Sequence, residues 1–275
     1  MSGGGISGFQ EPVRIVSDLH LAHPSSRIVE VESLRPLVAG ARTVVFNGDT
    51  CEQSCREWRA AGEEKLDELC ALCKEEGAEP HFVAGNHDPE ISERGWLDLA
   101  AGRIFLTHGH VMCLGGAPWS HEFLKRKEEI LQLVRERENA EADLAHHWET
   151  ARLLTRALHP AGTRRPGGRG RNYVLGALWP PRRLLTIAQT WLGIADTAGA
   201  FAERVRPEAS IVFFGHFHRP GLWRRGGRVI CNTGAFMRGS RALVGELTGG
   251  WLSIRAIAHE HDEFRPGERR ALFAI

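Results

Sequence analysis

The sequence predicts an α/β fold whose strands carry polar residues at their carboxyl ends. Several short apolar runs, each of strand length, stop at a glycine or at a histidine, aspartate or asparagine. Other segments place apolar residues at helical spacing. In an open α/β sheet the carboxyl ends of the strands share one edge, where ligands bind. We therefore expect polar residues between positions 18 and 218 to converge in one site.

The first three runs lie in the N-terminal third of the chain, and side chains of metal-binding type follow each of them. The runs and their polar residues are "VRIVSDLH" (13–20) with Asp18 and His20, "TVVFNGDT" (43–50) with Asp49, and "HFVAGNHD" (81–88) with Asn86, His87 and Asp88. One such run would be weak evidence, since a single polar residue after a strand is common. Their repetition indicates a shared site.

Two later runs end in pairs of histidines. They are "RIFLTHGH" (103–110) with His108 and His110, and "IVFFGHFHRP" (211–220) with His216 and His218. Side chains two positions apart on a strand point to the same side, so both imidazoles of a pair leave the strand end in one direction. A hydrogen-bonded core histidine is the ordinary alternative for one such residue. Five runs with the same ending favour a metal site instead.

The types of side chain narrow the choice of metal. Imidazole, carboxylate and amide oxygen, with no thiolate at a strand end, favour manganese, iron or zinc over calcium or a structural zinc site. Even seven ligands from this set would be more than one ion needs. Two ions roughly 3.5–4 Å apart that share a carboxylate would use them all, bind a phosphoryl group and generate a hydroxide nucleophile near neutral pH.

These residues together resemble the motifs of the calcineurin-like metallophosphoesterases. The family pattern is DxH, GD, GNH[DE], H and GHxH, and the resemblance covers about residues 13–112 and 207–258. It implies a four-layer α/β/β/α sandwich, here with a helical insertion. The matching blocks are Asp18-Leu19-His20, Gly48-Asp49, Gly85-Asn86-His87-Asp88, His108 and Gly215-His216-Phe217-His218.

The resemblance also implies a role for each residue, carried over by position. His87 would protonate the leaving oxygen or stabilise charge in the transition state, and Asp88 would orient its ring. His110 would either contact a metal ligand without binding metal itself, or contact the substrate. Two divalent ions are implied, Mn²⁺ first, with Fe or Zn as alternatives. Their ligands would be Asp18, His20 and His218 for one ion, Asn86, His108 and His216 for the other, and Asp49 between them.

The implied function is a dinuclear metal-dependent phosphoesterase that hydrolyses a phosphomonoester or phosphodiester by attack of a metal-bridged hydroxide. The segment GHFHRP and the helical insertion also resemble UDP-2,3-diacylglucosamine pyrophosphatases. That subfamily usually has GNRD where this chain has GNHD at 85–88. A third alternative is a non-catalytic protein-binding scaffold of the same fold, which usually shows broken ligand positions. None is broken here.

The middle of the chain departs from the family pattern and predicts a helical cap. We expect the catalytic core to comprise residues 1–112 and 207–275, with the cap at 113–206. Residues 120–158 have helical spacing without glycine or proline, 159–172 are rich in Pro, Gly and Arg, and 173–205 resume an apolar helical pattern. A cap over the metal site would select the substrate.

The basic part of this cap predicts an anionic partner. Between Arg152 and Arg183 there are arginines and no acidic residues, and an apolar helical segment with Trp191 follows. We expect substrate or membrane anions to bind here, next to an apolar surface, unless the stretch is only a solvated loop. The partner would be a phosphate ester, in part apolar, with peripheral membrane contact as an option. The arginines concerned are Arg164, Arg165, Arg169 and Arg171.

Composition agrees with a cytoplasmic enzyme. The chain has 275 residues, enough for one well-packed domain with an elaboration, and a net charge of +1, which gives no general attraction for a nucleic-acid polymer. The segment "MSGGGISGFQEP" (1–12) lacks the pattern of a signal peptide. The paired cysteines at 51–55 and 70–73 predict helix packing and reduced thiols, with structural zinc as the alternative. The oligomeric state stays open.

Overall fold

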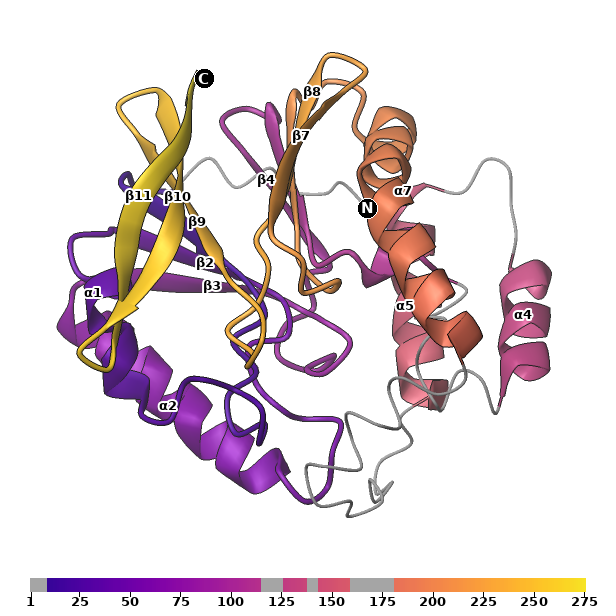
Figure 1. Cartoon of the computed structure of the whole chain (residues 1–275), viewed down its shortest axis with the longest axis horizontal. Coiled ribbons are helices and arrows are strands. Elements are labelled where there is room, and N and C mark those ends of the chain that lie inside the picture. Colours follow the sequence, from indigo (N-terminus) through magenta and orange to yellow (C-terminus); the bar gives the residue numbers. More distant parts are fainter. Residues whose placement is uncertain (1–8, 115–125, 138–142, 159–180) are drawn as a thin grey trace.

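Two β-sheets lie face to face, with helices on both outer faces (Figure 1). The computed structural model of the chain describes residues 9–114, 126–137, 143–158 and 181–275. The predicted four-layer α/β/β/α fold is confirmed. Among the described residues, no helix combines the length and the apolar character needed to cross a membrane.

The first sheet has six strands in the order β11-β10-β9-β1-β2-β3. The strands β1, β2 and β3 pair in parallel, and β9 joins β1 antiparallel. Helices η1 (Val31–Leu34), α1 (Arg35–Val38) and α2 (Arg59–Glu75) cover its outer face. The strands are β1 (Val13–Val16), β2 (Thr43–Asn47), β3 (Glu79–Val83), β9 (Leu243–Thr248), β10 (Trp251–Glu260) and β11 (Glu263–Ala274).

The second sheet has five strands in the order β4-β5-β6-β8-β7. The strands β5, β6 and β8 are parallel, and the antiparallel strands β4 and β7 form the edges. The strands are β4 (Trp96–Leu99), β5 (Ile104–Thr107), β6 (Ile211–Phe214), β7 (Gly221–Arg225) and β8 (Arg228–Asn232).

Helices from the middle of the chain form the outer layer on the second sheet. Helix α7 (Pro181–Val205) contacts β6, β7 and β8, and α5 (Leu144–Leu158) contacts the short helix η2 (His110–Met112), which follows β5. Helix α4 (Lys127–Glu136) packs on α5. The boundaries 113–206 of the cap stay a prediction, and Arg164, Arg165, Arg169 and Arg171 lie outside the described residues.

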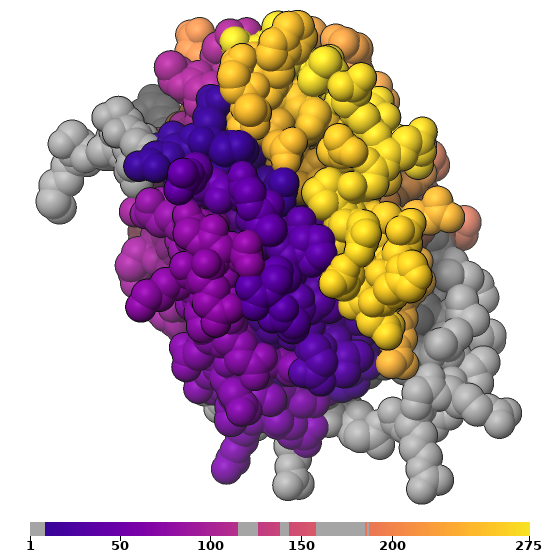
Figure 2. All heavy atoms as spheres, turned by 90° about the vertical axis from the view of Figure 1, so that its left-hand side faces the viewer, coloured from indigo at the N-terminus to yellow at the C-terminus, as the bar shows by residue number. Residues whose placement is uncertain are grey.

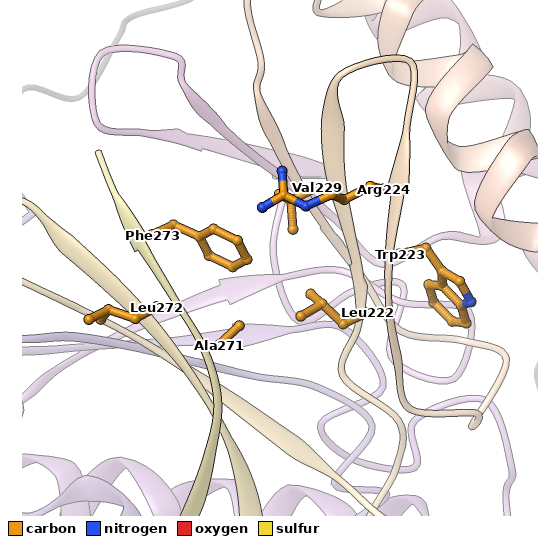
Figure 3. A pocket seen from close by; sticks show the side chains of 7 residues that line it. All are labelled: Leu222, Trp223, Arg224, Val229, Ala271, Leu272 and Phe273. Atoms are coloured by element: carbon orange, nitrogen blue, oxygen red, sulfur yellow. The ribbon is translucent and has the colours of Figure 1, made fainter.

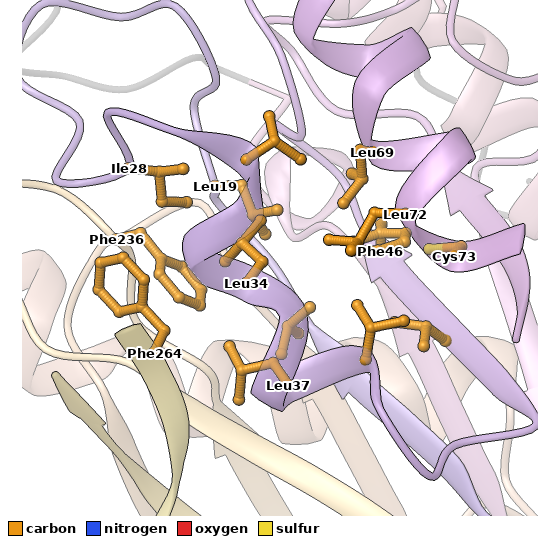
Figure 4. Packing of buried hydrophobic residues seen from close by; sticks show 14 of the residues in the cluster. Leu19, Ile28, Leu34, Leu37, Phe46, Leu69, Leu72, Cys73, Phe236 and Phe264 are labelled. Atoms are coloured by element: carbon orange, nitrogen blue, oxygen red, sulfur yellow. The ribbon is translucent and has the colours of Figure 1, made fainter. Parts of the chain in front are cut away.

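Three apolar layers hold these four layers of structure together. Leu69 and Leu72 of α2 pack with Phe46 of β2 beneath the helices of the first sheet (Figure 4). A second group fills the space between the sheets, and a third lies between α7, α5 and the second sheet. Burial of the apolar side chains in these three layers is the main stabilising contribution to the fold. This packing also holds both sheets in place behind the loops that follow their strands.

The last two strands close the first sheet against the N-terminal helices. Figure 2 shows one face of the molecule on which β10 and β11, in yellow, lie beside the indigo and purple N-terminal segments. Helices η1 and α1 contact β11, and Phe264 of β11 packs with Phe236 at a ring-centroid distance of 5.2 Å. The C-terminal strands are therefore part of the first sheet, beyond residue 258 where the resemblance ends. The bounds 207–275 of the second part of the core and its C-terminal tail stay a prediction.

A cavity of about 340 Å³ opens between the edge strands β7 and β11 (Figure 3). Leu222 and Phe273 face each other across it, and Leu272 is partly exposed at its side. Its other lining residues come from the same strands and from β8. None of them is among the residues predicted to bind metal or substrate.

Two details of the sequence interpretation need correction. The five predicted strand ends do not share the edge of one sheet, because β1, β2 and β3 belong to the first sheet and β5 and β6 to the second. On α2, Cys73 is buried as expected from helix packing, but Cys70 is only half-buried, and Leu69 and Leu72 are the buried residues beside Cys73. Cys51 and Cys55 precede α2 and are buried outside it, so helix packing applies only to Cys70 and Cys73.

Candidate metal centre

The loops after β1, β2 and β6 hold the predicted ligands in a strained backbone conformation. Five of these ligands have φ between +50° and +67°, a region that residues other than glycine rarely adopt. Such strain costs of order 1 kcal/mol per residue and persists where the surrounding structure and a function require it. The five residues are Asp18, His20, Asp49, His216 and His218.

Four predicted ligands form a first cluster. Asp18, His20, Asp49 and His218 each offer one ligand atom, and these atoms lie within 4.8 Å of one another. The Nε2 atoms of His20 and His218 are 3.0 Å apart, and His218 Nε2 is 3.3 Å from Asp18 Oδ1. The buried carboxylates form the floor, while the ring of His218 is about one-third exposed. The cluster is therefore open on one side.

A second cluster shares Asp49 with the first. Asp49, His108 and His216 bring ligand atoms within 4.8 Å of one another, and Asp49 Oδ2 is 3.1 Å from His108 Nε2. Asn86 stands beside them, because its neighbour His87 donates its backbone N–H to Asp49 Oδ1 at 2.8 Å. The structure thus brings six of the seven predicted metal ligands into two clusters around Asp49. Asn86 is placed only through the backbone of the next residue.

Several buried atoms in these clusters have no hydrogen-bond partner within the described part of the chain. They include Asn86 Oδ1, and the only close partner of His108 Nε2 among the described residues is the ion-pair contact with Asp49 Oδ2 at 3.1 Å. Buried polar atoms are normally paired, so each unpaired one requires an explanation. In addition, His20 donates Nδ1–H to Glu52, so its Nε2 presents a lone pair to His218 Nε2. A cation between these atoms would satisfy them, so the residues present fit divalent metal ions.

Two glycines allow the loops to approach the carboxylates closely. A Cβ atom on Gly85 would lie 2.2 Å from Asp49 Oδ1, and one on Gly215 would lie 2.0 Å from Asp18 Oδ2. Either contact is far shorter than a van der Waals distance. Glycine is therefore required before Asn86 and before His216, which explains this part of both motifs.

The charges of the clustered side chains shift one another's pKa values strongly. Burial alone would raise the pKa of Asp49, but the facing imidazoles, His108 first, hold that pKa well below its usual value. Burial opposes protonation of His108, yet Asp49 and Asp18 raise the pKa of His108 to about 10. Burial and then the charge of His108 lower the pKa of His216. Asp49 is thus ionised, and its charge favours the protonated form of His108.

Glu52 is a site residue that the sequence interpretation missed. Its buried carboxylate accepts hydrogen bonds from Nδ1 of His20 and from Nδ1 of His87, each at 3.0 Å. Burial would raise the pKa of Glu52, but His87 and His20 hold it well below the usual value, so the group is ionised and accepts both protons. The available signal was a carboxylate three positions after Asp49 in the same loop.

The expectation that Asp88 orients the His87 ring is wrong. Asp88 Oδ1 accepts the backbone N–H groups of Asp49 and Gly85, and its Oδ2 accepts those of Thr50 and Cys51. Burial and the charge of Asp49 raise the pKa of Asp88 to about 7, against the effect of these N–H donors. Asp88 therefore fastens the Asp49 loop to the loop that carries His87, and Glu52 holds the ring.

His110 lies behind the second cluster. Its ring is buried 5.5 Å from that of His108 and 5.7 Å from that of Trp148, measured between centroids. Neither of its ring nitrogens has a hydrogen-bond partner among the described residues. Burial, followed by the charge of His108, lowers the pKa of His110 to about 3. This placement favours a supporting position behind His108. Contact of His110 with substrate stays a prediction.

Comparison with known proteins gives one family match and several structures of similar fold. The profile described as calcineurin-like phosphoesterase matches residues 11–220. None of the curated proteins compared with the chain matches its sequence.

Three of the similar solved structures are the following. A dimetal phosphatase from Danio rerio is 12% identical with a TM-score of 0.47, over 96% of this chain and 99% of that chain. A phosphoesterase from E. coli, Yfce, is 18% identical with a TM-score of 0.43, over 96% and 99%. Vacuolar protein sorting 29 from Cryptosporidium parvum is 12% identical with a TM-score of 0.46, over 96% and 99%.

Proposed function

The chain belongs to the calcineurin-like phosphoesterases, and we propose that it hydrolyses phosphate esters at a centre of two divalent metal ions. The observation that carries the proposal is the pair of ligand clusters that share Asp49. A single carboxylate between two groups of imidazoles is the arrangement that two adjacent cations require. The substrate would be a phosphomonoester or a phosphodiester.

The donor set favours Mn²⁺, with Fe and Zn as alternatives, because it combines imidazole with carboxylate and amide oxygen. Asp18, His20 and His218 would hold one ion, and Asn86, His108 and His216 the other. When bound, the ions would supply Lewis acidity toward the phosphate and lower the pKa of water. The partly exposed His218 and His87 mark the side from which substrate would enter.

The role proposed for His87 is to deliver a proton to the leaving oxygen. Because its Nδ1 is held by Glu52, Nε2 is the ring nitrogen that would act on substrate. The same carboxylate fixes His20 with Nε2 toward the first cluster. Glu52 would thus orient the rings of both His87, the proposed proton donor, and His20, a proposed metal ligand. Carboxylates beyond the ligands orient metal-binding histidines in this way.

We expect Glu52→Gln to lower kcat by roughly 10- to 100-fold. A glutamine offers only one acceptor oxygen, so its amide N–H₂ must face the Nδ1–H of either His20 or His87. The measurement is steady-state kinetics together with the metal content of the purified variant. Glu246→Gln is the matched control, since Glu246 pairs with Arg14 away from the site. A Glu52→Gln enzyme as active as the control would contradict this role.

The proposed function is tested with bis-p-nitrophenyl phosphate and p-nitrophenyl phosphate in the presence of added manganese. We expect activity that a chelator abolishes and manganese restores, and two ions per fully active chain by elemental analysis. One ion or fewer in the fully active protein would refute the dinuclear centre. Absence of any phosphatase activity in the fully loaded protein would favour the non-catalytic scaffold. Turnover of nucleotide–lipid pyrophosphates alone would favour the alternative pyrophosphatase.

A further inference from the structure

Two buried hydroxyl groups lie behind Asp18, one from each sheet. Ser17 directly follows β1 of the first sheet, and Thr233 directly follows β8 of the second. Their oxygen atoms are 2.5 Å apart, and Ser17 Oγ also forms a hydrogen bond with Asp18 Oδ2. Both side chains are buried, so each hydroxyl must find its partners inside the protein. We call Ser17 and Thr233 the hydroxyl pair.

The single proton of each hydroxyl fixes the direction of these hydrogen bonds. A carboxylate that binds metal is deprotonated, so Asp18 can only accept and Ser17 must donate to it. Ser17 then has no proton left for its contact with Thr233, and Thr233 donates to Ser17 Oγ. The other acceptor near the Thr233 hydroxyl is the Phe214 carbonyl at 3.1 Å, which already receives the Thr233 backbone N–H at 2.9 Å.

The backbone of Thr233 is held by both sheets. Its N–H donates to the carbonyl of Phe214, the last residue of β6, and its own carbonyl accepts the N–H of Leu243, the first residue of β9, at 2.7 Å. Strand β6 belongs to the second sheet and β9 to the first. The Thr233 hydroxyl therefore starts from a fixed point where the two sheets meet, and Ser17 connects that point to Asp18.

The hydrogen bond from Ser17 distinguishes the two oxygens of Asp18. Ser17 contacts Oδ2, whereas Oδ1 faces the imidazoles, 3.3 Å from Nε2 of His218 and 3.9 Å from Nε2 of His20. The backbone nitrogen of His216 lies 3.0 Å from Oδ1 and 3.2 Å from Oδ2, so it holds the carboxylate without selecting either oxygen. With Oδ2 held by Ser17, Oδ1 stays directed at the first cluster.

We propose that the hydroxyl pair consists of two positioning residues for the metal centre. Thr233 holds Ser17, and Ser17 holds Asp18 with Oδ1 toward the ion of the first cluster. The inference rests on the proposed function, since it requires a metal ion at this cluster. Groups that hydrogen-bond to metal ligands commonly set the affinity for the metal. Both hydroxyls act through Asp18, so their loss should appear first as weaker metal binding.

The test measures the affinity of the metal-free protein for Mn²⁺ by titration calorimetry. Ser17→Ala removes the hydrogen bond to Asp18 and should weaken binding at one of the two sites roughly 10- to 100-fold. Thr233→Val keeps the shape of the side chain, removes its hydroxyl and should weaken the same site roughly fivefold. Thr233→Ser retains the hydroxyl and should restore the wild-type affinity.

Thr43→Val is the matched control for the loss of a buried hydroxyl. Thr43 is buried at the start of β2, and its Oγ1 donates to the carbonyl of Gln10 at 2.9 Å. Asp49 follows the other end of this strand. We therefore expect Thr43→Val to lower the melting temperature of the metal-free protein, as Thr233→Val does, but to keep the wild-type affinity for Mn²⁺.

The double variant Ser17→Ala/Thr233→Val decides whether Thr233 acts through Ser17. If it does, the double variant should bind Mn²⁺ within about twofold of Ser17→Ala alone, because the second substitution has nothing left to transmit. Losses that multiply would show that Thr233 acts by another route and would overturn the inference.

Other outcomes would also overturn it. Wild-type Mn²⁺ affinity in a folded Ser17→Ala variant would show that Ser17 does not position Asp18. If Ser17→Ala does not fold, equal affinities of Thr233→Val, Thr233→Ser and Thr43→Val would reject the role of the hydroxyl pair. A protein that binds two Mn²⁺ ions with the expected losses but hydrolyses no phosphate ester would refute the proposed activity and support the positioning role. A protein that binds no Mn²⁺ would reject both.

Discussion

Asp49→Asn should abolish most of the activity, with a loss in kcat/KM of roughly a thousandfold or more. Asp49 is the one ligand that belongs to both clusters, whereas Asp18 belongs to the first only. The substitution removes one of the two carboxylates that would offset the mutual repulsion of two divalent ions. It also removes the charge that raises the pKa of His108, so both sides of the centre are affected.

The measurement combines kinetics on bis-p-nitrophenyl phosphate with elemental analysis of the purified variant. We expect fewer than two ions per chain even at high manganese concentration. Asp98→Asn is the matched control, because Asp98 lies on β4, forms an ion pair with Arg206 and contacts none of the predicted ligands. If Asp49→Asn retained two ions and activity within tenfold of the control, Asp49 would not be the shared ligand.

The candidate metal ligands could be named because each one follows a strand at a short distance. The strand places the start of its loop, and the loop is too short to carry the ligand elsewhere, so β1 fixes Asp18 and β6 fixes His216. The division of these strands between two sheets was not predicted from the runs themselves. A run of four or five apolar residues shows that a strand is buried, but not with which strand it pairs.

The contacts between loops could not be predicted from the sequence. Glu52 and His87 are 35 positions apart, and only the folded loops bring the carboxylate to the ring. Asp88 follows His87 directly, which made it the obvious partner, yet its side chain points to the backbone of the loop from Asp49 to Cys51. The contact of Arg219 with Trp191 likewise depends on how α7 packs on the second sheet.

His87→Ala should lower kcat by roughly a hundredfold or more while both metal ions stay bound. The ring of His87 contacts Glu52 and belongs to neither cluster around Asp49. The contact of this residue with Asp49 is made by its backbone N–H, which alanine retains. The ligand geometry should therefore survive, and elemental analysis should find the wild-type content of metal. His81→Ala, on β3, is the matched control.

The dependence on the leaving group decides what His87 does. A proton donor matters most when the departing oxygen is strongly basic and little when it is a good leaving group such as p-nitrophenolate. If His87 protonates that oxygen through Nε2, the loss in the alanine variant should grow steadily from p-nitrophenyl to phenyl to alkyl esters. Equal losses across the series would show instead that the imidazole acts on the phosphate by charge or position. If His87 is the proton donor, the losses in Glu52→Gln should also grow from p-nitrophenyl to alkyl esters, because Glu52 acts on the leaving group only through the ring of His87.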